Sequence, residues 1–255
     1  MLLIHMFACL SDNYGFLIRD SASGKVACID TPDATAILAE ADKLGWQIDE
    51  IWNTHWHPDH AGGNQAIEKA HGARSLGPAE VDQRISPLSQ IVHPGEMLRL
   101  GDSSAEVLDV GGHTLGHIAF HFAADQVAFV GDSLFALGCG RLFEGSAEQA
   151  WNSLSRLMAL PDETRIYCAH EYTAANARFC ATIEADNAAL QARLEEITRL
   201  RQDNQPTVPT TIGLERATNP FVRADMASVR AAVAADASLP AHEVFAIIRK
   251  RKDTF

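Results

Sequence analysis

Four side chains that can bind a metal ion lie close together in the segment NTHWHPDHAGGN, residues 53–64. They are His55, His57, Asp59 and His60. Imidazole and carboxylate groups are the protein ligands that suit zinc, iron and manganese. A solvated polar loop explains one or two such residues but not four within six positions. We therefore interpret the segment as a metal-binding loop.

Further candidate ligands follow other predicted strands. One tight loop cannot place all four groups on a single ion and still leave an open position for a substrate. The additional candidates are His113 in GGHTLGH, Asp132 in FVGDSLF and His170 in YCAHEYT. Each alone is a weak signal, because a single histidine after a strand is more often a hydrogen-bonded core or surface residue. Together with the first group they are sufficient for two metal ions that share one carboxylate.

The residues around these candidates predict an alternation of strands and helices. Short apolar runs bounded by Gly, Asp and Pro indicate strands, and apolar residues at helical spacing indicate helices over 35–45, 62–72 and 147–160. Ligand sites of α/β folds lie at the carboxyl ends of strands, where the candidate residues stand. The predicted strands cover 2–9, 14–20, 25–30, 50–54, 105–110, 117–122, 126–132 and 165–170.

The composition of the chain changes at about residue 173. Segments rich in Ala, Leu, Glu and Arg, over 174–202, 224–236 and 240–251, predict helices with no further strands. We therefore predict an α/β catalytic domain over residues 1–172 and a helical domain over residues 173–255.

Charge and cysteine content limit the classes of function. The 255 residues carry a net charge of −12 at pH 7, which argues against binding nucleic acid or an anionic membrane. Five cysteines without a C-x-x-C pair indicate neither a disulfide framework nor a zinc ribbon. The apolar start MLLIHMFACL lacks a basic segment and is interpreted as a strand. We expect a cytoplasmic monomer without a membrane span.

The motif HWHPDH, followed by GH, GD and a further His at strand ends, resembles the metallo-β-lactamase superfamily. Within it the chain is most similar to the hydroxyacylglutathione hydrolase, or glyoxalase II, family. DNY at 12–14, LFEG at 142–145, HEYT at 170–173, TNPF at 218–221 and the terminal KDTF carry this narrower resemblance. It implies an α/β fold, a four-layer αββα sandwich of two mixed sheets, with a C-terminal helical domain that binds substrate.

The resemblance also implies a centre of two divalent metal ions, with zinc expected first and iron or manganese as alternatives. One ion would bind His55, His57 and His113, the other would bind Asp59, His60 and His170, and Asp132 would bridge them.

The activity that the resemblance implies is hydrolysis of S-2-hydroxyacylglutathione, such as S-D-lactoylglutathione, in the detoxification of methylglyoxal. The products are glutathione and a 2-hydroxy acid, D-lactate in this case. Asp59, acting with a metal-bound hydroxide, is the implied catalytic residue. Phe143 stands where some members have Tyr, and Gly111-Gly112 where Pro-Gly is frequent. The implied substrate-binding residues are Arg141, Phe143, Tyr172, Arg249 and Lys252.

Several other functions remain open on sequence grounds. A lactonase or β-lactamase of the same fold, a mononuclear iron persulfide dioxygenase and a flavin-linked di-iron oxidase share part of the ligand pattern. A non-catalytic, metal-stabilised binding module is a further alternative. The basic end RKRKDTF favours a glutathione substrate, which carries two carboxylates, although basic residues there also complement a helix dipole. Cys139 is expected to pack as a small apolar residue and not to act as a nucleophile.

Overall fold

The computed structural model describes residues 1–255, which divide into two units by backbone proximity. The N-terminal unit consists of residues 1–109 and 116–131, and the C-terminal unit of residues 110–115 and 132–255. The helical C-terminal segment thus shares its unit with residues 132–172. The predicted division of domains at residue 172 stays a prediction.

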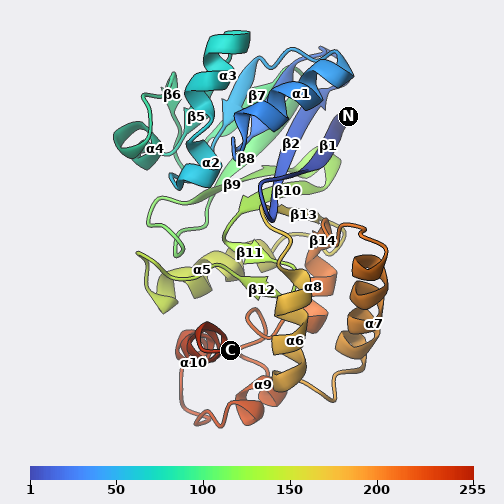
Figure 1. Cartoon of the computed structure of the whole chain (residues 1–255). Coiled ribbons are helices and arrows are strands. Elements are labelled where there is room, and N and C mark those ends of the chain that lie inside the picture. Colours follow the sequence, from blue (N-terminus) through green and yellow to red (C-terminus); the bar gives the residue numbers. More distant parts are fainter. The chain divides into compact units, whose positions relative to one another are not determined.

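A six-stranded mixed sheet forms one layer of the N-terminal unit (Figure 1). Its first three strands are antiparallel, and the later strands add in parallel. Parallel neighbours need a crossover connection, and helices supply it here. The strands, in spatial order, are β1 (Leu2–Cys9), β2 (Asn13–Asp20), β3 (Val26–Ile29), β4 (Glu50–Trp52), β5 (Arg74–Gly77) and β6 (Gln90–Ile91).

Helices cover the outer face of this sheet (Figure 1). In α1 (Ala34–Leu44), Asp33 caps the N-terminus by accepting from the backbone N–H groups of Thr35 and Ala36, and Gly45 ends the helix at a φ of 64°. The apolar side chains of α1 and α3 (Asn64–His71) pack with those of β2, β3 and β4 in one core cluster. The two short helices of this unit are α2 (Pro58–Ala61) and α4 (Ala79–Arg84).

Antiparallel strands form the second layer of the N-terminal unit. Large aromatic side chains fill the space between the layers: the Trp52 ring stacks on Phe122 at 5.8 Å and lies 5.2 Å from Phe120. The edge of Phe16 meets Phe129 at 5.4 Å. These strands are β7 (Met97–Leu100), β8 (Ser103–Asp109), β9 (Ile118–Phe122) and β10 (Val127–Gly131), and the 3-10 turn η1 (Ala123–Asp125) joins the last two.

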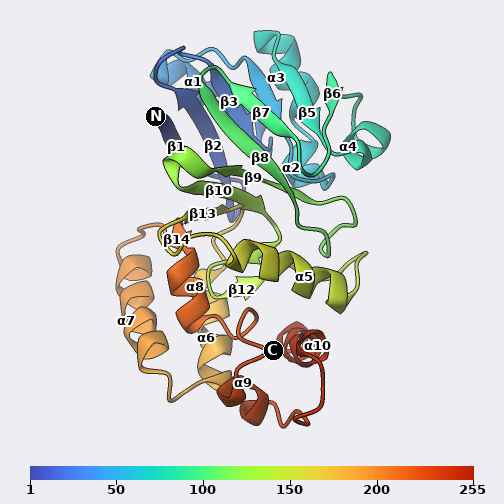
Figure 2. The same cartoon turned by 180° about the vertical axis from the view of Figure 1, so that it is seen from behind.

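The C-terminal unit is mainly helical (Figure 2). Helices α6 and α7 lie side by side, and their apolar faces share a core cluster with Leu137. Trp151 of α5 packs against Phe245 of α10 at 6.3 Å. The helices are α5 (Ala147–Met158), α6 (Thr173–Ile183), α7 (Ala188–Gln202), α8 (Ile212–Thr218), α9 (Ala227–Ala232) and α10 (Ala241–Asp253).

Short strand pairs complete the C-terminal unit: β11 (Leu134–Phe135) with β12 (Gly138–Cys139), and β13 (Arg165–Cys168) with β14 (Thr210–Thr211). The prediction of no strand after residue 173 is therefore wrong. Two residues are too few to show an alternating pattern, and β14 exists because β13, distant in sequence, lies beside it.

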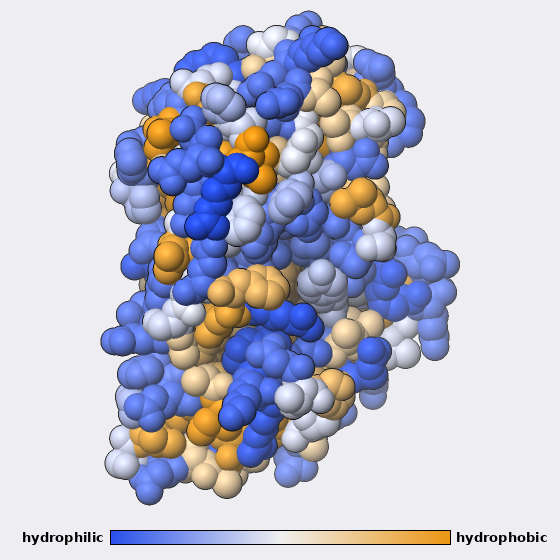
Figure 3. Space-filling view, turned by 60° about the vertical axis from the view of Figure 1, so that its left-hand side comes forward, coloured by the Kyte–Doolittle hydropathy of each residue, from blue (hydrophilic) through white to orange (hydrophobic).

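Every predicted strand has a counterpart in the structure, and β1 has the predicted bounds. No helix has both the length and the apolar character required to cross a membrane. The face of the molecule drawn in Figure 3 is largely hydrophilic, and its apolar side chains form small groups.

Trp52→Ala should lower the free energy of unfolding by about 3–5 kcal/mol, because it removes a fully buried aromatic side chain that contacts two others. Guanidinium unfolding measures this change. Met97→Ala is the control, since Met97 is 60% exposed and its loss should change the stability little. Equal effects of both substitutions would show that the contact between the layers does not carry this stability.

Candidate metal centre and adjoining cavity

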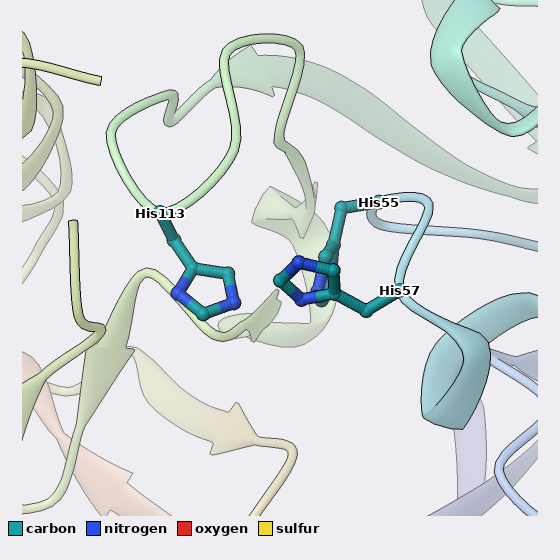
Figure 4. A group of neighbouring side chains, drawn as sticks. All are labelled: His55, His57 and His113. Atoms are coloured by element: carbon teal, nitrogen blue, oxygen red, sulfur yellow. The ribbon is translucent and has the colours of Figure 1, made fainter. Parts of the chain in front are cut away.

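The metal-binding loop of the N-terminal unit follows β4. His55 and His57 stand in its extended part, and their imidazoles meet edge to face at 78°, with His55 Nε2 and His57 Nδ1 3.1 Å apart (Figure 4). Pro58 then begins α2, which carries Asp59 and His60. His60 Nε2 lies 3.6 Å from Asp59 Oδ2. The loop thus brings four predicted ligands together within one unit.

The carboxylate of Asp30, at the end of β3, orients two of these histidines. Its Oδ1 accepts from the Thr54 N–H at 2.7 Å, and its Oδ2 accepts from the Thr54 hydroxyl and from His60 Nδ1, both at 2.8 Å. The Thr54 hydroxyl donates its proton to Asp30, so it accepts from His55 Nδ1 at 3.0 Å.

These bonds fix the tautomers of His55 and His60. Because Nδ1 carries the proton in each ring, Nε2 presents a lone pair. A carboxylate or hydroxyl partner on the far nitrogen is the usual support of a metal-binding histidine. His55 and His60 are both buried, and each offers its Nε2 lone pair to a divalent cation while Asp30 and Thr54 hold the opposite nitrogen.

Asp59 is oriented by a residue from another strand. Asn13, at the start of β2, donates from its side-chain amide to Asp59 Oδ2 at 3.1 Å. This contact gives the DNY motif of the sequence a role in placing the metal-binding loop.

In the C-terminal unit, Asp132 lies between two histidines. His113 Nε2 is 3.4 Å from Asp132 Oδ2, and His170 Nε2 is 3.3 Å from Asp132 Oδ1. His113 Nδ1 donates to the carbonyl of Arg141 at 2.8 Å, which again leaves Nε2 with its lone pair. Each oxygen of this carboxylate therefore lies beside a different histidine.

Two glycines allow the backbone to present these ligands. Gly112, immediately before His113, has a φ of 143°, and a Cβ there would lie 2.8 Å from the Cβ of Ala150. Gly131, immediately before Asp132, has a φ of 50°. The second glycine of the Gly111-Gly112 pair is thus required by the path of the loop.

A cavity of about 470 Å³ opens beside Asp132 within the C-terminal unit. It is lined by two predicted metal ligands together with all five predicted substrate-binding residues. These residues are His113 and Asp132, and Arg141, Phe143, Tyr172, Arg249 and Lys252.

The cationic side chains of α10 are partly engaged by the protein. The buried Arg249 donates to the Cys139 carbonyl at 2.9 Å and to Asp253 at 2.9 Å. Lys252 Nζ lies over the rings of Phe179 and Phe255, at 5.5 and 5.3 Å. Burial, and then the nearby Arg249 charge, lower the pKa of Lys252. An anion that enters the cavity would therefore stabilise the charged forms of these side chains.

Two aromatic side chains of the cavity wall contact histidines that are candidate metal ligands. Tyr172 stacks on His170, with ring centroids 4.7 Å apart and planes 2° from parallel. Phe143, 63% exposed, meets the His113 ring edge-on at 5.2 Å. Cys139 also lines the cavity, but burial raises the pKa of its thiol to about 11, so it is protonated at neutral pH.

Comparisons with known proteins identify the families to which the two parts of the chain are similar. Residues 16–170 match the metallo-beta-lactamase superfamily, and residues 171–255 match the family described as hydroxyacylglutathione hydrolase C-terminus. A protein of Erythrobacter litoralis named hydroxyacylglutathione hydrolase is 55% identical over 255 residues, which is 100% of both chains. A protein of the same name from Maricaulis maris is 55% identical over 254 residues, 100% of this chain and 99% of that one.

The chain belongs to the hydroxyacylglutathione hydrolase family. It has the metallo-β-lactamase fold with the C-terminal helical region of that family, as predicted. Solved structures share the fold: ETHE1 from Myxococcus xanthus has a TM-score of 0.70 at 23% identity, covering 98% of this chain and 91% of that one. A metallo-beta-lactamase from Staphylococcus aureus has a TM-score of 0.66 at 22% identity, covering 99% and 71%.

Sequence reasoning missed the residues that orient the candidate ligands. Asp30 and Thr54 are supporting residues from separate segments, and the signal that could have found Asp30 is its position at the end of a buried strand. His117 is fully buried and stacks on His55, with ring centroids 4.4 Å apart.

Asp30→Asn should weaken divalent metal binding about 10- to 100-fold, because an amide cannot accept from both Thr54 and His60 as the carboxylate does. Competition with a chromogenic chelator measures the affinity. Asp33→Asn is the control, since asparagine caps a helix as well as aspartate does. Unchanged affinity in the Asp30 variant would refute the orienting role.

Asp132→Ala should lose more bound metal than any single histidine substitution in the C-terminal unit, because one carboxylate faces both histidines there. Elemental analysis after dialysis gives the metal content per chain. Cys139→Ala should keep its metal, since a protonated thiol is a poor ligand. Loss of metal in the cysteine variant would assign Cys139 a ligand role and contradict this interpretation.

Proposed function

We propose that this chain hydrolyses S-2-hydroxyacylglutathione thioesters, such as S-D-lactoylglutathione, to glutathione and a 2-hydroxy acid. The observation that carries the proposal is the cavity of the C-terminal unit, whose wall holds metal-ligand candidates and three cationic side chains together. The name of the relatives from Erythrobacter litoralis and Maricaulis maris supports it.

The proposed cofactor is a pair of divalent cations, zinc first, with iron or manganese as alternatives. When bound, such a pair supplies a hydroxide nucleophile at neutral pH and polarises the thioester carbonyl. The tautomers of His55, His60 and His113 support metal binding through Nε2. The proposed ligands are His55, His57 and His113 for one ion, Asp59, His60 and His170 for the other, and Asp132 for both.

The chain's own residues prepare the site for the reaction. Asp30 and Thr54 hold the histidine rings in place, and Asn13 holds the Asp59 carboxylate, the residue proposed to orient the proton of the nucleophile. The leaving group is a thiol with an unperturbed pKa of about 8.5, so it departs as a thiolate without a general acid. This chemistry explains why no further acidic side chain is needed beside the ligands.

The glutathione part of the substrate is proposed to lie in the cavity of the C-terminal unit. Its carboxylates would pair with Arg141, Arg249 and Lys252, and the Tyr172 hydroxyl would bond its peptide groups. Phe143 would pack against the ligand but, unlike a tyrosine, cannot donate a hydrogen bond. This local basic wall is what an anionic substrate needs in a chain of net charge −12.

The alternative hydrolases and oxidases of this fold are less well supported. A lactone or a β-lactam gives no reason for Arg249 and Lys252 at the cavity wall, whereas residues 171–255, which contain both, match a family named for hydroxyacylglutathione hydrolase. The likeness to ETHE1 at 23% identity concerns the fold alone. We also propose a cytoplasmic monomer, and five buried free thiols support a reducing compartment.

Wild-type protein should turn over S-D-lactoylglutathione, and Lys252→Ala should raise KM about tenfold or more with kcat little changed. The reason is that the amine contacts a part of the substrate that does not change during hydrolysis. Steady-state kinetics with the metal-loaded enzyme measures both constants. Lys250→Ala is the control, because Lys250 is an exposed residue of the same helix.

A small thioester without the glutathione peptide should be hydrolysed equally by wild type and Lys252→Ala. Added salt should narrow their difference for the full substrate, since partly exposed ion pairs are screened. Arg249→Ala should also raise KM, but the loss of its bond to Cys139 should lower stability as well. A wild-type enzyme that is inactive on the glutathione thioester would overturn the proposed function.

A further inference from the structure

The wall of the cavity in the C-terminal unit includes a neutral polar side chain from the first turn of α6. Asn176 lines the cavity wall, although it is 7% exposed as a residue. No substrate role was predicted for it from the sequence. Most other polar groups of the wall donate hydrogen bonds or carry positive charge, so an amide at this position adds a different kind of contact.

The orientation of the Asn176 amide follows from its partner in the turn between β11 and β12. Nδ2 donates to the carbonyl of Ala136 at 3.2 Å, and a carbonyl can only accept, so the nitrogen faces the turn. No protein group donates to Oδ1, and Oδ1 is not among the enclosed polar atoms of the chain. The oxygen therefore opens to the cavity that Asn176 lines.

Gly138 keeps the amide in this position. A Cβ at residue 138 would lie 2.4 Å from Asn176 Nδ2 and 3.2 Å from Oδ1, so a side chain there would displace the amide. Only a glycine on β12 allows the amide to lie flat against the turn. The orientation of Oδ1 is thus set on two sides, by a hydrogen bond and by contact.

An acceptor held toward a ligand cavity selects for a donor on the ligand. The peptide part of glutathione offers amide N–H groups, which the cations of the wall cannot accept. The two carboxylates of the wall are already engaged, Asp253 by Arg249 and Asp132 by two histidines. We propose that Asn176 Oδ1 accepts a hydrogen bond from an amide N–H of the peptide part of the substrate. Asn176 is then a specificity-determining residue for peptide thioesters, an inference that rests on the proposed function.

Asn219 provides a matched control because it supports the same turn from the other side. Its Nδ2 donates to the carbonyl of Gly138 at 3.1 Å and to Glu215 at 2.9 Å. Asn219 is fully buried and is not part of the cavity wall. Removing Asn219 therefore weakens the support of the turn without removing an acceptor from the cavity.

The test measures KM and kcat of wild type, Asn176→Ala and Asn219→Ala, each loaded with metal, for four substrates. These are S-D-lactoylglutathione, two analogues in which one or the other peptide amide N–H is replaced by an ester oxygen, and a small thioester without the peptide. Asn176→Ala should raise KM for the glutathione thioester about two- to tenfold, with kcat and the small thioester unaffected. For one of the two ester analogues, KM in wild type should exceed that of the parent thioester by a similar factor. In Asn176→Ala, the same analogue and the parent thioester should have equal KM values.

Asn219→Ala should lower thermal stability without this substrate pattern. If both variants affect every substrate alike, or if wild type treats both ester analogues like the parent thioester, the proposal is overturned while the proposed function stands. If Asn176→Ala does not fold, the ester analogues still test the proposal in wild type, because equal KM values for the parent thioester and both analogues overturn it. A wild-type enzyme without turnover of S-D-lactoylglutathione would instead overturn the proposed function, and this inference with it.

Discussion

The order of the metal-binding loop depends on the carboxylate of Asp30. This buried group accepts from the Thr54 backbone, the Thr54 hydroxyl and His60 Nδ1, and through the hydroxyl it also determines the tautomer of His55. Asp30 itself has a φ of 56°, a conformation that aspartate tolerates better than most residues. The Asp30 side chain thus determines which nitrogen of His55 and of His60 carries a lone pair. Burying its charge is unfavourable unless hydrogen-bond donors compensate for the lost water.

A second buried carboxylate has a comparable structural role in the C-terminal unit. Glu215 is fully buried and accepts from the side chains of Arg193, Thr210 and Asn219, and from the backbone N–H of Leu137. Leu137 has a φ of 58° in the turn between β11 and β12. The network therefore holds in place the turn that presents Phe135 and Cys139 to the cavity. A buried ion pair of this kind is weak evidence for stability, but it does define one geometry for the turn.

Charge is distributed unevenly in this protein. The chain is acidic as a whole, whereas the cavity wall carries Arg141, Arg249 and Lys252 with Asp253 as the opposing carboxylate. The guanidinium of Arg249 is buried against the Phe221 ring and the Cys139 carbonyl, so its position is defined before any ligand binds. A cation that is already desolvated and fixed interacts more strongly with an anion than a solvated one does. Such a wall supports the proposed binding of an anionic glutathione thioester.

The sequence alone determined which residues are candidate metal ligands, their spacing after strand ends and the mainly helical character of the last third, because these depend on local chemistry and periodicity. It could not determine that Asp30 supports His60 thirty residues away, that Asn13 holds Asp59, or that Thr210–Thr211 pair with β13. Nor could it show which way the Asn176 amide points. Each of these contacts joins segments distant in the chain, and a hydrogen bond between them depends on where the fold brings the two backbones. Tertiary structure therefore decided the tautomers, the orientations and the acceptor that faces the cavity.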